Sequence, residues 1–353
     1  MAAAAFIPCG QFKTTYAKDT TIFPTPVSRA FAVLALVLLC LVPLVASRYQ
    51  LNLAIQIGYY GIAALGLNIL VGSTGQISLG HAAFFGFGAF TSAYLNNAYG
   101  IPVFFAIPLA GLITTAVGLV FGIPAGRIKG LYLAIATFAS QFILEDFFAR
   151  ADWFTGGSAG SIASPFGLFG YEFSSDQSYF YVVLAYLVVM FLLGANLLRS
   201  RDGRAFVALR DHYLSAEVMG INLTKYRILS FGISSFYAGI GGALFGHYLG
   251  YVSAEAFTIL LSIQFLGMII IGGLGSVMGT LMGTAFMVLL PEVMEAGVQN
   301  LGGILPGMSD ALAFIKQAAI GLAIVLFLIF EPDGLAHRWR MIKAYWKLYP
   351  FSY

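Results

Sequence analysis

Basic side chains gather in one stretch of an otherwise apolar chain. Six of the 18 Lys and Arg residues fall between positions 199 and 227, where the sequence reads RSRDGRAFVALRDHYLSAEVMGINLTKYR. Apolar residues repeat there at spacings of three and four and Gly220 is a natural helix stop, so the pattern predicts a short amphipathic helix over 203–220. A charged helix face needs water or a protein partner. The stretch is therefore either a docking surface for a cytoplasmic subunit or an ordinary solvated loop.

A second group of polar residues lies inside long apolar segments, where a polar side chain is costly and is therefore a candidate for function. We expect Asn68, Gln76 and His81 to line a transport path. The acidic pair at 145–146 lies next to Arg150, so an interfacial ion pair explains it. The remaining polar residues in apolar segments are Gln141, His247, Gln264, Glu292 and Glu295.

Two glycine-rich stretches stand at the starts of apolar segments. The first covers 72–81 and includes Gln76, Ser78 and His81, and the second covers 272–283. Backbone opened by several glycines is tolerated at membrane depth only where protein buries it or where it lines a wet cavity. Transporters use such broken helices to present polar backbone to substrates. Close helix packing is the alternative, and it is stronger for the second stretch because the first adds polar side chains.

The residue patterns needed for catalysis or cofactor binding are missing. The four histidines, at 81, 212, 247 and 337, are too dispersed for a paired metal motif, and the two cysteines, at 9 and 40, indicate no disulfide framework. The dipeptide Gly-Lys does not occur, so the chain has no G-x-x-x-x-G-K-[ST] loop to hold a nucleotide phosphate. We expect no enzyme activity, no metal and no cofactor. If ATP drives transport here, another subunit must hydrolyse it.

Composition sets the class of the protein. Hydrophobic residues make up 59% and charged residues 9% of the 353 positions, whereas a soluble chain has roughly 45–50% and 25%. We expect an all-α, polytopic membrane protein with glycine-broken helices and about ten spans, with eight or nine crossings as alternatives. The predicted spans are 30–46, 50–70, 76–98, 103–125, 131–148, 179–198, 228–250, 259–275, 277–296 and 312–330.

The basic residues predict the orientation. If both ends of the chain are cytoplasmic, only Arg48, Arg150 and Lys316 of the 18 lie outside, as the positive-inside rule requires. A cleaved signal peptide with its core at 30–46 is the alternative, but that core is long and no clear cleavage site follows it. The predicted parts are a cytoplasmic tail at 1–29, a transmembrane domain at 30–335 with an outer loop at 149–178 and an inner loop at 199–227, and a cytoplasmic tail at 336–353.

The outer loop at 149–178 breaks the pattern of short connections. Loops of this length without clear structure tend to be functional or disordered. A docking surface for an extracytoplasmic partner and a passive linker are equally good interpretations.

Four ordered motifs mark the chain between about 51 and 340. They are TGQISLGHAAF at 74–84 with GFGAF at 86–90, RDGRA at 201–205 with AEVMGIN at 216–222 and the glycine cluster at 239–242, GGLGS at 272–276, and FEPDGL at 330–335. In this order they resemble the motifs of permease subunits of branched-chain amino acid ABC transporters. Neither the N-terminal tail nor the outer loop takes part in the resemblance.

The resemblance implies a permease of a bacterial inner-membrane importer that works by alternating access around a central path. Its partners would be a second, related permease, two cytoplasmic ATP-binding subunits, a periplasmic substrate-binding protein and the lipid bilayer, with no nucleic acid. The path residues would be Asn68, Gln76, Ser78 and His81. The residues that couple the permease to the ATPase would be Arg201, Arg204, Arg210, Glu217 and Gly220.

The substrate is the least constrained part of this interpretation. We favour a branched-chain or other hydrophobic amino acid. Urea, short amides and aromatic acids are alternatives, because importers of these compounds use similar permeases and selectivity rests mostly on the binding protein. An ion-coupled secondary carrier should have charged residues at mid-span and a membrane enzyme should have a clustered catalytic set, and the sequence shows neither.

Overall fold

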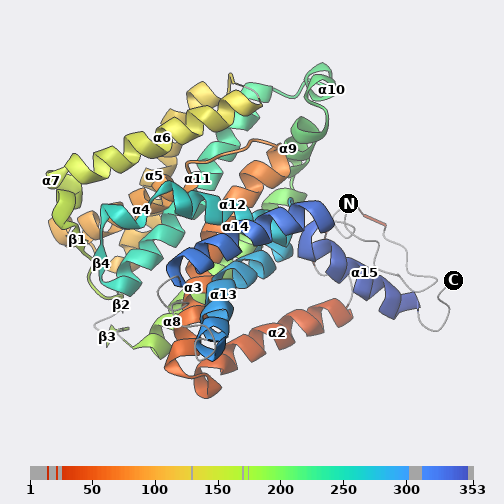
Figure 1. The fold of residues 1–353 in the computed structure, drawn as a ribbon. Coiled ribbons are helices and arrows are strands. Elements are labelled where there is room, and N and C mark those ends of the chain that lie inside the picture. Colours follow the sequence, from red (N-terminus) through yellow and green to blue (C-terminus); the bar gives the residue numbers. More distant parts are fainter. Residues whose placement is uncertain are drawn as a thin grey trace.

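Long helices packed into one bundle make up most of the computed structural model (Figure 1). The structure describes residues 26–128, 130–168, 171–173, 175–301 and 312–348, together with 14–15 and 21–22. The long helices in this part are α2 (Pro26–Val45), α3 (Arg48–Leu67), α4 (His81–Tyr99), α5 (Val103–Ala125), α6 (Leu131–Arg150), α8 (Asp176–Arg199), α11 (Leu223–Leu249), α12 (Ile259–Gly272), α13 (Val277–Leu301) and α14 (Leu312–Phe330).

Nine helices of the described ranges are long and apolar enough to cross a membrane. The 19-residue helix α4 is not among them, although it is buried over most of its length. The prediction of an all-α, multi-pass membrane protein is confirmed. Each predicted span overlaps one of the long helices, and the segment at 131–148, which is short enough to raise the question of a re-entrant loop, is a full 20-residue helix.

The start of α4 differs from the prediction for a physical reason. A helix is predicted from 76, but the backbone is not helical between Gly75, which has φ +71°, and Gly80. Gly80 has no side chain to cap the new helix, so the first-turn N–H groups need other partners. Ser262 Oγ on α12 accepts a hydrogen bond from the backbone N–H of residue 82 (2.9 Å), and Gln141 Oε1 on α6 accepts from that of residue 83 (3.0 Å).

The centre of the bundle is α11, which packs against α3, α4 and α5. Glycines let these backbones touch: a Cβ at Gly88 would lie 2.3 Å from the carbonyl oxygen of Gly239, and a Cβ at Gly242 would lie 1.8 Å from that of Phe85. Small residues play this part in membrane helix packing. Aromatic rings fill the remaining space, with the rings of Phe85 and Phe265 5.4 Å apart.

The predicted outer loop forms a small folded cap. Its elements are α7 (Asp152–Thr155), η2 (Gly157–Ala159), β1 (Ser161–Ile162), β2 (Gly167–Leu168) and β3 (Tyr171–Glu172), followed after α11 by β4 (Tyr251–Val252) and η3 (Ala254–Ala256). β1 pairs with β4 and β2 pairs with β3, both antiparallel. The cap is therefore tied to the end of α11. We call this end of the bundle the cap end.

The basic stretch lies at the opposite end, the α9 end (Figure 1). It forms two helices, α9 (Arg201–Asp211) and α10 (Tyr213–Val218), so the prediction of one helix over 203–220 is wrong. The extended backbone of His212, with φ −156°, breaks the helix, whereas Gly220, with φ +84°, ends it as predicted. We refer to residues 199–222 as the basic segment.

Of the two predicted cytoplasmic tails, the structure describes mainly the C-terminal one. Most of the tail at 1–29 lies outside the described residues, while the other tail contributes α15 (Gly334–Leu348), which packs against α12 and α13. Gly334 lies against the turn that joins those helices, because a Cβ on it would be 2.5 Å from the backbone nitrogen of Gly273.

Candidate functional site

The four residues predicted to line a path lie in and after η1 (Asn68–Ser73), a π-helical turn that continues α3. They are Asn68, Gln76, Ser78 and His81, and each is at most 4% exposed. The non-helical stretch between η1 and α4 is partly covered by protein, since Gln76, Ser78 and Gly80 are buried while Gly75 and Ile77 are exposed. Burial in protein is one of the two settings in which such backbone is tolerated at membrane depth. In this conformation the side chains of Asn68, Gln76 and His81 bind other parts of the bundle. The role of all four in a path stays a prediction.

Asn68 joins the first glycine stretch to the second. Its Oδ1 accepts a hydrogen bond from the backbone N–H of Gly275 (2.8 Å), and its Nδ2 donates to the carbonyl oxygen of Ser276 (3.1 Å). A Cβ on Gly72 would lie 2.3 Å from the nitrogen of Gly275, so the two backbones touch. The glycine-rich stretches at 72–81 and 272–283 therefore lie in direct contact with each other.

Gln76 and His81 bind groups of two other helical segments. Gln76 Nε2 donates to the hydroxyl oxygens of Thr74 and Ser230, both at 2.8 Å, while its Oε1 is buried without a hydrogen-bond partner. His81 Nε2 lies 2.8 Å from the carbonyl oxygen of Ala63. A carbonyl only accepts, so Nε2 holds the proton and donates it. Gln76 Oε1 is therefore a buried acceptor that a ligand or water could bind.

The second glycine stretch, at 272–283, combines the two predicted features, close helix packing and a break between helices. A Cβ on Gly272 would lie 2.2 Å from the carbonyl oxygen of Gly279, and one on Gly283 would lie 2.0 Å from that of Met268, so α12 and α13 pack closely. Between these helices Gly273 and Gly275 have φ +105° and +79° and form a turn. Close packing explains the helical glycines, and a broken helix explains the turn.

The predicted coupling residues lie on the basic segment and are exposed, although the Arg210 side chain is only 37% exposed. Exposed members are Arg201, Arg204, Arg210, Glu217 and Gly220. Arg204 Nη1 donates to the carbonyl oxygen of Arg199 (3.1 Å). Arg210 has two partners: its Nε lies 2.8 Å from Asp211 Oδ1, and its Nη1 donates to the carbonyl oxygen of Gly72 (2.7 Å).

Apolar residues of the basic segment are a feature that the sequence analysis missed. Val218 and Met219 at the end of α10 are 87% and 85% exposed, and Leu214 is 57% exposed. The signal was present in the sequence as two apolar residues directly before the stop at Gly220. An exposed apolar tip on a charged segment is typical of a protein-docking surface.

Asn52 and Gln56 on α3 were also missed. They are half-buried, and Gln56 Nε2 donates to Asn52 Oδ1 (2.7 Å). Their spacing of four along a predicted span was the available signal. They give the cap-side half of α3 a polar stripe.

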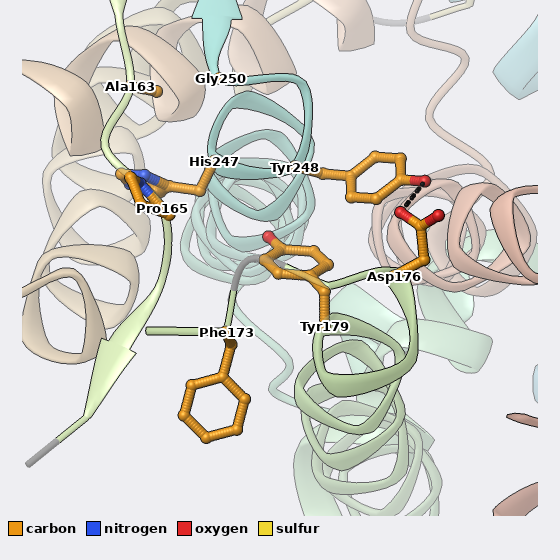
Figure 2. Close-up of a pocket in the computed structure, with 8 residues that line it drawn as sticks. All are labelled: Ala163, Pro165, Phe173, Asp176, Tyr179, His247, Tyr248 and Gly250. Atoms are coloured by element: carbon orange, nitrogen blue, oxygen red, sulfur yellow. Dashed lines mark hydrogen bonds between the residues drawn. The ribbon is translucent and has the colours of Figure 1, made fainter. Parts of the chain in front are cut away.

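A cavity of about 160 Å³ opens at the cap end between α8, α11 and the cap. Figure 2 shows the ring of Tyr179 inside it, with Tyr248 directed toward Asp176. Tyr248 Oη donates to Asp176 Oδ1 (3.4 Å), and Tyr179 Oη donates to the carbonyl oxygen of Leu244 (2.6 Å). These two hydrogen bonds join α8 to α11 beneath the cap.

His247, which also lines this cavity, has both ring nitrogens occupied. Its Nδ1 donates to the carbonyl oxygen of Ser164 (2.7 Å), and its Nε2 accepts from Ser92 Oγ (2.7 Å). The residue therefore joins α11 to α4 and to the cap, which is a structural role.

The acidic residues near span ends are mostly paired. The predicted ion pair forms between Asp146 and Arg150, at 2.8 Å, and Lys316 pairs with Glu295 at 2.5 Å. Tyr49 donates to Glu292. Glu145 does not join the ion pair, and its Oε2 is buried without a hydrogen-bond partner.

Among the residues that the structure describes, no group of three or more His, Cys, Asp or Glu side chains could hold a metal ion.

Comparisons with known proteins agree with these features. The family model described as branched-chain amino acid transport system / permease component matches residues 49–329. The chain is 33% identical over 336 residues to the high-affinity branched-chain amino acid transport system permease protein LivM of Salmonella typhimurium, covering 87% of this chain and 74% of that protein. No solved structure matches the chain.

Two further relatives are more distant. The probable branched-chain amino acid transport permease protein LivM of Methanocaldococcus jannaschii is 27% identical over 312 residues, covering 81% of this chain and 88% of that protein. The probable ABC transporter permease protein YphD of Escherichia coli is 29% identical over 146 residues, or 40% of each chain. The family match extends from the start of α3 nearly to the end of α14 and leaves out α2 and α15.

Proposed function

Because the chain belongs to the family of permease components of branched-chain amino acid transport systems, we propose that it is the membrane subunit of an ATP-driven ABC importer. It forms the translocation path for branched-chain or other hydrophobic amino acids, while a separate subunit hydrolyses ATP. The observation that carries the proposal is the family match over 49–329, because it includes both glycine stretches and the whole basic segment.

The distribution of charge supports an orientation in the bacterial inner membrane. The basic segment and α15 lie at the same end of the bundle (Figure 1), and both are rich in Arg and Lys. At the cap end, Arg150 is paired with Asp146. The positive-inside rule then puts the α9 end in the cytoplasm and the cap in the periplasm. Both termini of the chain are cytoplasmic in this orientation.

Each end of the bundle presents a surface for a different partner subunit. At the α9 end, the exposed apolar tip at Val218 and Met219 together with the charged side chains of Arg201, Arg204 and Glu217 form a surface for one of two ATP-binding subunits. At the cap end, the folded cap receives a periplasmic substrate-binding protein. A second, homologous permease completes the membrane part.

The path itself is proposed to pass the first glycine stretch. The supporting observation is that Asn68, Gln76, Ser78 and His81 bring polar side chains to non-helical backbone inside the membrane domain. Binding elements of this kind allow alternating access when the surrounding helices move apart. In this proposal, the near-complete burial of these four side chains is what a closed state of the path would require.

Copurification tests the assembly. The tagged protein is co-expressed with the other subunits of its transporter, extracted in detergent and compared with the double variant Val218→Asp/Met219→Asp. We expect the ATP-binding subunits to copurify with the wild type and to be lost from the variant, because a carboxylate at a buried apolar contact is costly. The control is Trp339→Asp on α15, which changes an exposed apolar residue at the same end of the bundle. Retention of the ATPase by the double variant would show that docking occurs elsewhere.

Uptake into reconstituted vesicles tests the substrate. With ATP and the binding protein supplied, labelled leucine should accumulate, and unlabelled isoleucine and valine should compete. Accumulation of urea or an aromatic acid without leucine would refute the substrate but keep the permease. Accumulation of leucine driven by an ion gradient alone would refute the ATP-driven mechanism.

A further inference from the structure

Three segments far apart in the sequence meet at the α9 end. They are the end of η1 at Gly72, the turn between α12 and α13 at 273–276, and the last turn of α9 at Arg210. Two of the three lie inside the membrane domain, whereas the third belongs to the basic segment. The contact among them is therefore a direct connection between the membrane domain and the segment that faces the cytoplasm.

Within the membrane domain, the first two segments are held together by hydrogen bonds and by close backbone contact. Asn68, which is 1% exposed, uses both atoms of its amide on the backbone of Gly275 and Ser276. At the same place, a Cβ at Gly72 would overlap the nitrogen of Gly275. Buried hydrogen bonds with both partners satisfied resist separation, because breaking them leaves unpaired polar groups in a low-dielectric interior. η1 and the 273–276 turn should move together.

Arg210 binds to this joined pair. Its Nη1 donates to the carbonyl oxygen of Gly72 at 2.7 Å. Its side chain also fills the space that glycines leave open: a Cβ at Gly75 would lie 3.1 Å from Arg210 Cγ, and a Cβ at Gly275 would lie 3.3 Å from Nη1. Both glycines have positive φ, so their turns present open backbone to the guanidinium.

The bond suits arginine for a chemical reason. Carbonyl oxygens near the end of a helix lack partners in the helix and carry partial negative charge. A guanidinium offers several donors in a fixed plane, so Arg210 can bind Gly72 through Nη1 while Nε stays on Asp211. A lysine at this position would keep the charge but could not hold both partners with the same geometry.

We propose that Arg210 is a positioning residue that transmits movement of the basic segment to the joined glycine turns, with Asn68 keeping the two turns together. This inference rests on the proposed function, since it requires the basic segment to move with an ATPase. Displacement of α9 then pulls on the cytoplasmic ends of α3, α12 and α13 at one point. The turns are where the path opens to the cytoplasm.

The first experiment separates transmission from docking. The variant Arg210→Gln is purified with its partner subunits, and three quantities are measured: copurification of the ATPase, ATP hydrolysis, and leucine uptake into vesicles. We expect the complex to remain intact and ATP hydrolysis to continue, while uptake per ATP hydrolysed falls by about tenfold, which corresponds to about 1.4 kcal/mol. Arg210→Lys should recover part of the uptake. Arg127→Gln, an exposed charge at the same end of the bundle, is the matched control and should behave as wild type.

Each outcome of this experiment is informative. Normal uptake by Arg210→Gln would overturn the proposal, and so would loss of the ATPase, because Arg210 would then act in docking. Absence of any ATPase from the wild-type preparation would instead refute the proposed function.

A second measurement does not depend on the variant folding. In a cysteine-free background, spin labels are placed at Val207 on α9 and at Leu274 in the turn, two positions that are 37% and 48% exposed. If the segments move as one unit, the distance between the labels stays the same with and without ATP, while the distance from Leu274 to a label at Trp153 in the cap changes. A change in the 207–274 distance on ATP binding would overturn the proposal.

Discussion

Two helices of this bundle, α11 and α14, cross the membrane in very different surroundings. In the most apolar window of α11, 78% of the residues are buried inside the protein, against 6% in α14. Yet α14 has the higher mean hydropathy, and the same contrast holds between α3, extended by η1, and α2. In a soluble protein the buried helix would be the more apolar one.

The difference reflects what drives packing in lipid. Helices gain little from hiding apolar side chains from a solvent that is itself apolar, so close backbone contact and hydrogen bonds decide which helices take the centre. α11 supplies glycines and serines, including Gly239, Gly242 and Ser230, whereas α14 presents large apolar side chains to the outside. The central helices also carry the polar residues that the proposed transport function needs.

The largest expected difference between the central and the peripheral helices comes from adding the same side chain at a glycine in each. Gly88→Leu on α4 should destabilise the protein by more than about 3 kcal/mol, beyond the usual cost of overpacking, because its Cβ would meet the backbone of Gly239 at 2.3 Å. The measurement is the thermal unfolding midpoint in detergent.

Gly321→Leu on α14 is the control for this substitution, since nothing lies within 4 Å of its added Cβ. We expect a change of no more than about 0.5 kcal/mol. Similar losses at the two glycines would show that α14 is as closely packed as α4.

The second test removes the same side-chain atoms from the centre and from the edge. Leu67→Ala on α3 should cost about 2–5 kcal/mol, because this fully buried leucine leaves a cavity. Leu44→Ala on α2, where the leucine is 74% exposed, should cost about 0.5 kcal/mol or less. Chemical denaturation in mixed micelles measures both, and equal costs would mean that α2 is packed against protein in solution.

A third and smaller effect concerns the polar interior. Gln141→Leu removes the acceptor of the residue-83 N–H and the donor to the carbonyl of Phe257, which lies 2.6 Å away. We expect a loss of about 1–3 kcal/mol from the groups left without partners. Gln299→Leu is the matched control, because this glutamine is exposed and its hydrogen bond to Glu295 is long, at 3.3 Å. Equal melting temperatures for the two variants would contradict a structural role for interior hydrogen bonds.

These contrasts also explain what could be predicted from the sequence. The long helices were predictable because apolar runs of about 20 residues have few other uses. The start of α4 was not, because its first N–H groups donate to Gln141 and Ser262, which lie in distant parts of the chain. The break at His212 was missed because apolar residues continue at helical spacing across it.

The candidate site shows the same limit. Composition and spacing were enough to single out Asn68 and Arg210, but not to reveal that both bind glycine turns, because their partners are more than a hundred residues away in sequence. The half-buried pair Asn52 and Gln56 was not predicted, and only their hydrogen bond shows that they act together. Long-range pairing, which local patterns do not encode, decides what these polar side chains do.

The bond between Asn68 and the distant turn also has a consequence for biosynthesis. The residue and its partner Gly275 are 207 positions apart, and at roughly 5–20 residues per second a ribosome needs on the order of 10–40 s to synthesise that length. Through this interval the amide of Asn68 is already made, but the turn that will bind it does not yet exist. Because an amide without partners is costly in hydrocarbon, water or the insertion machinery must occupy it until the nascent chain delivers α12 and α13.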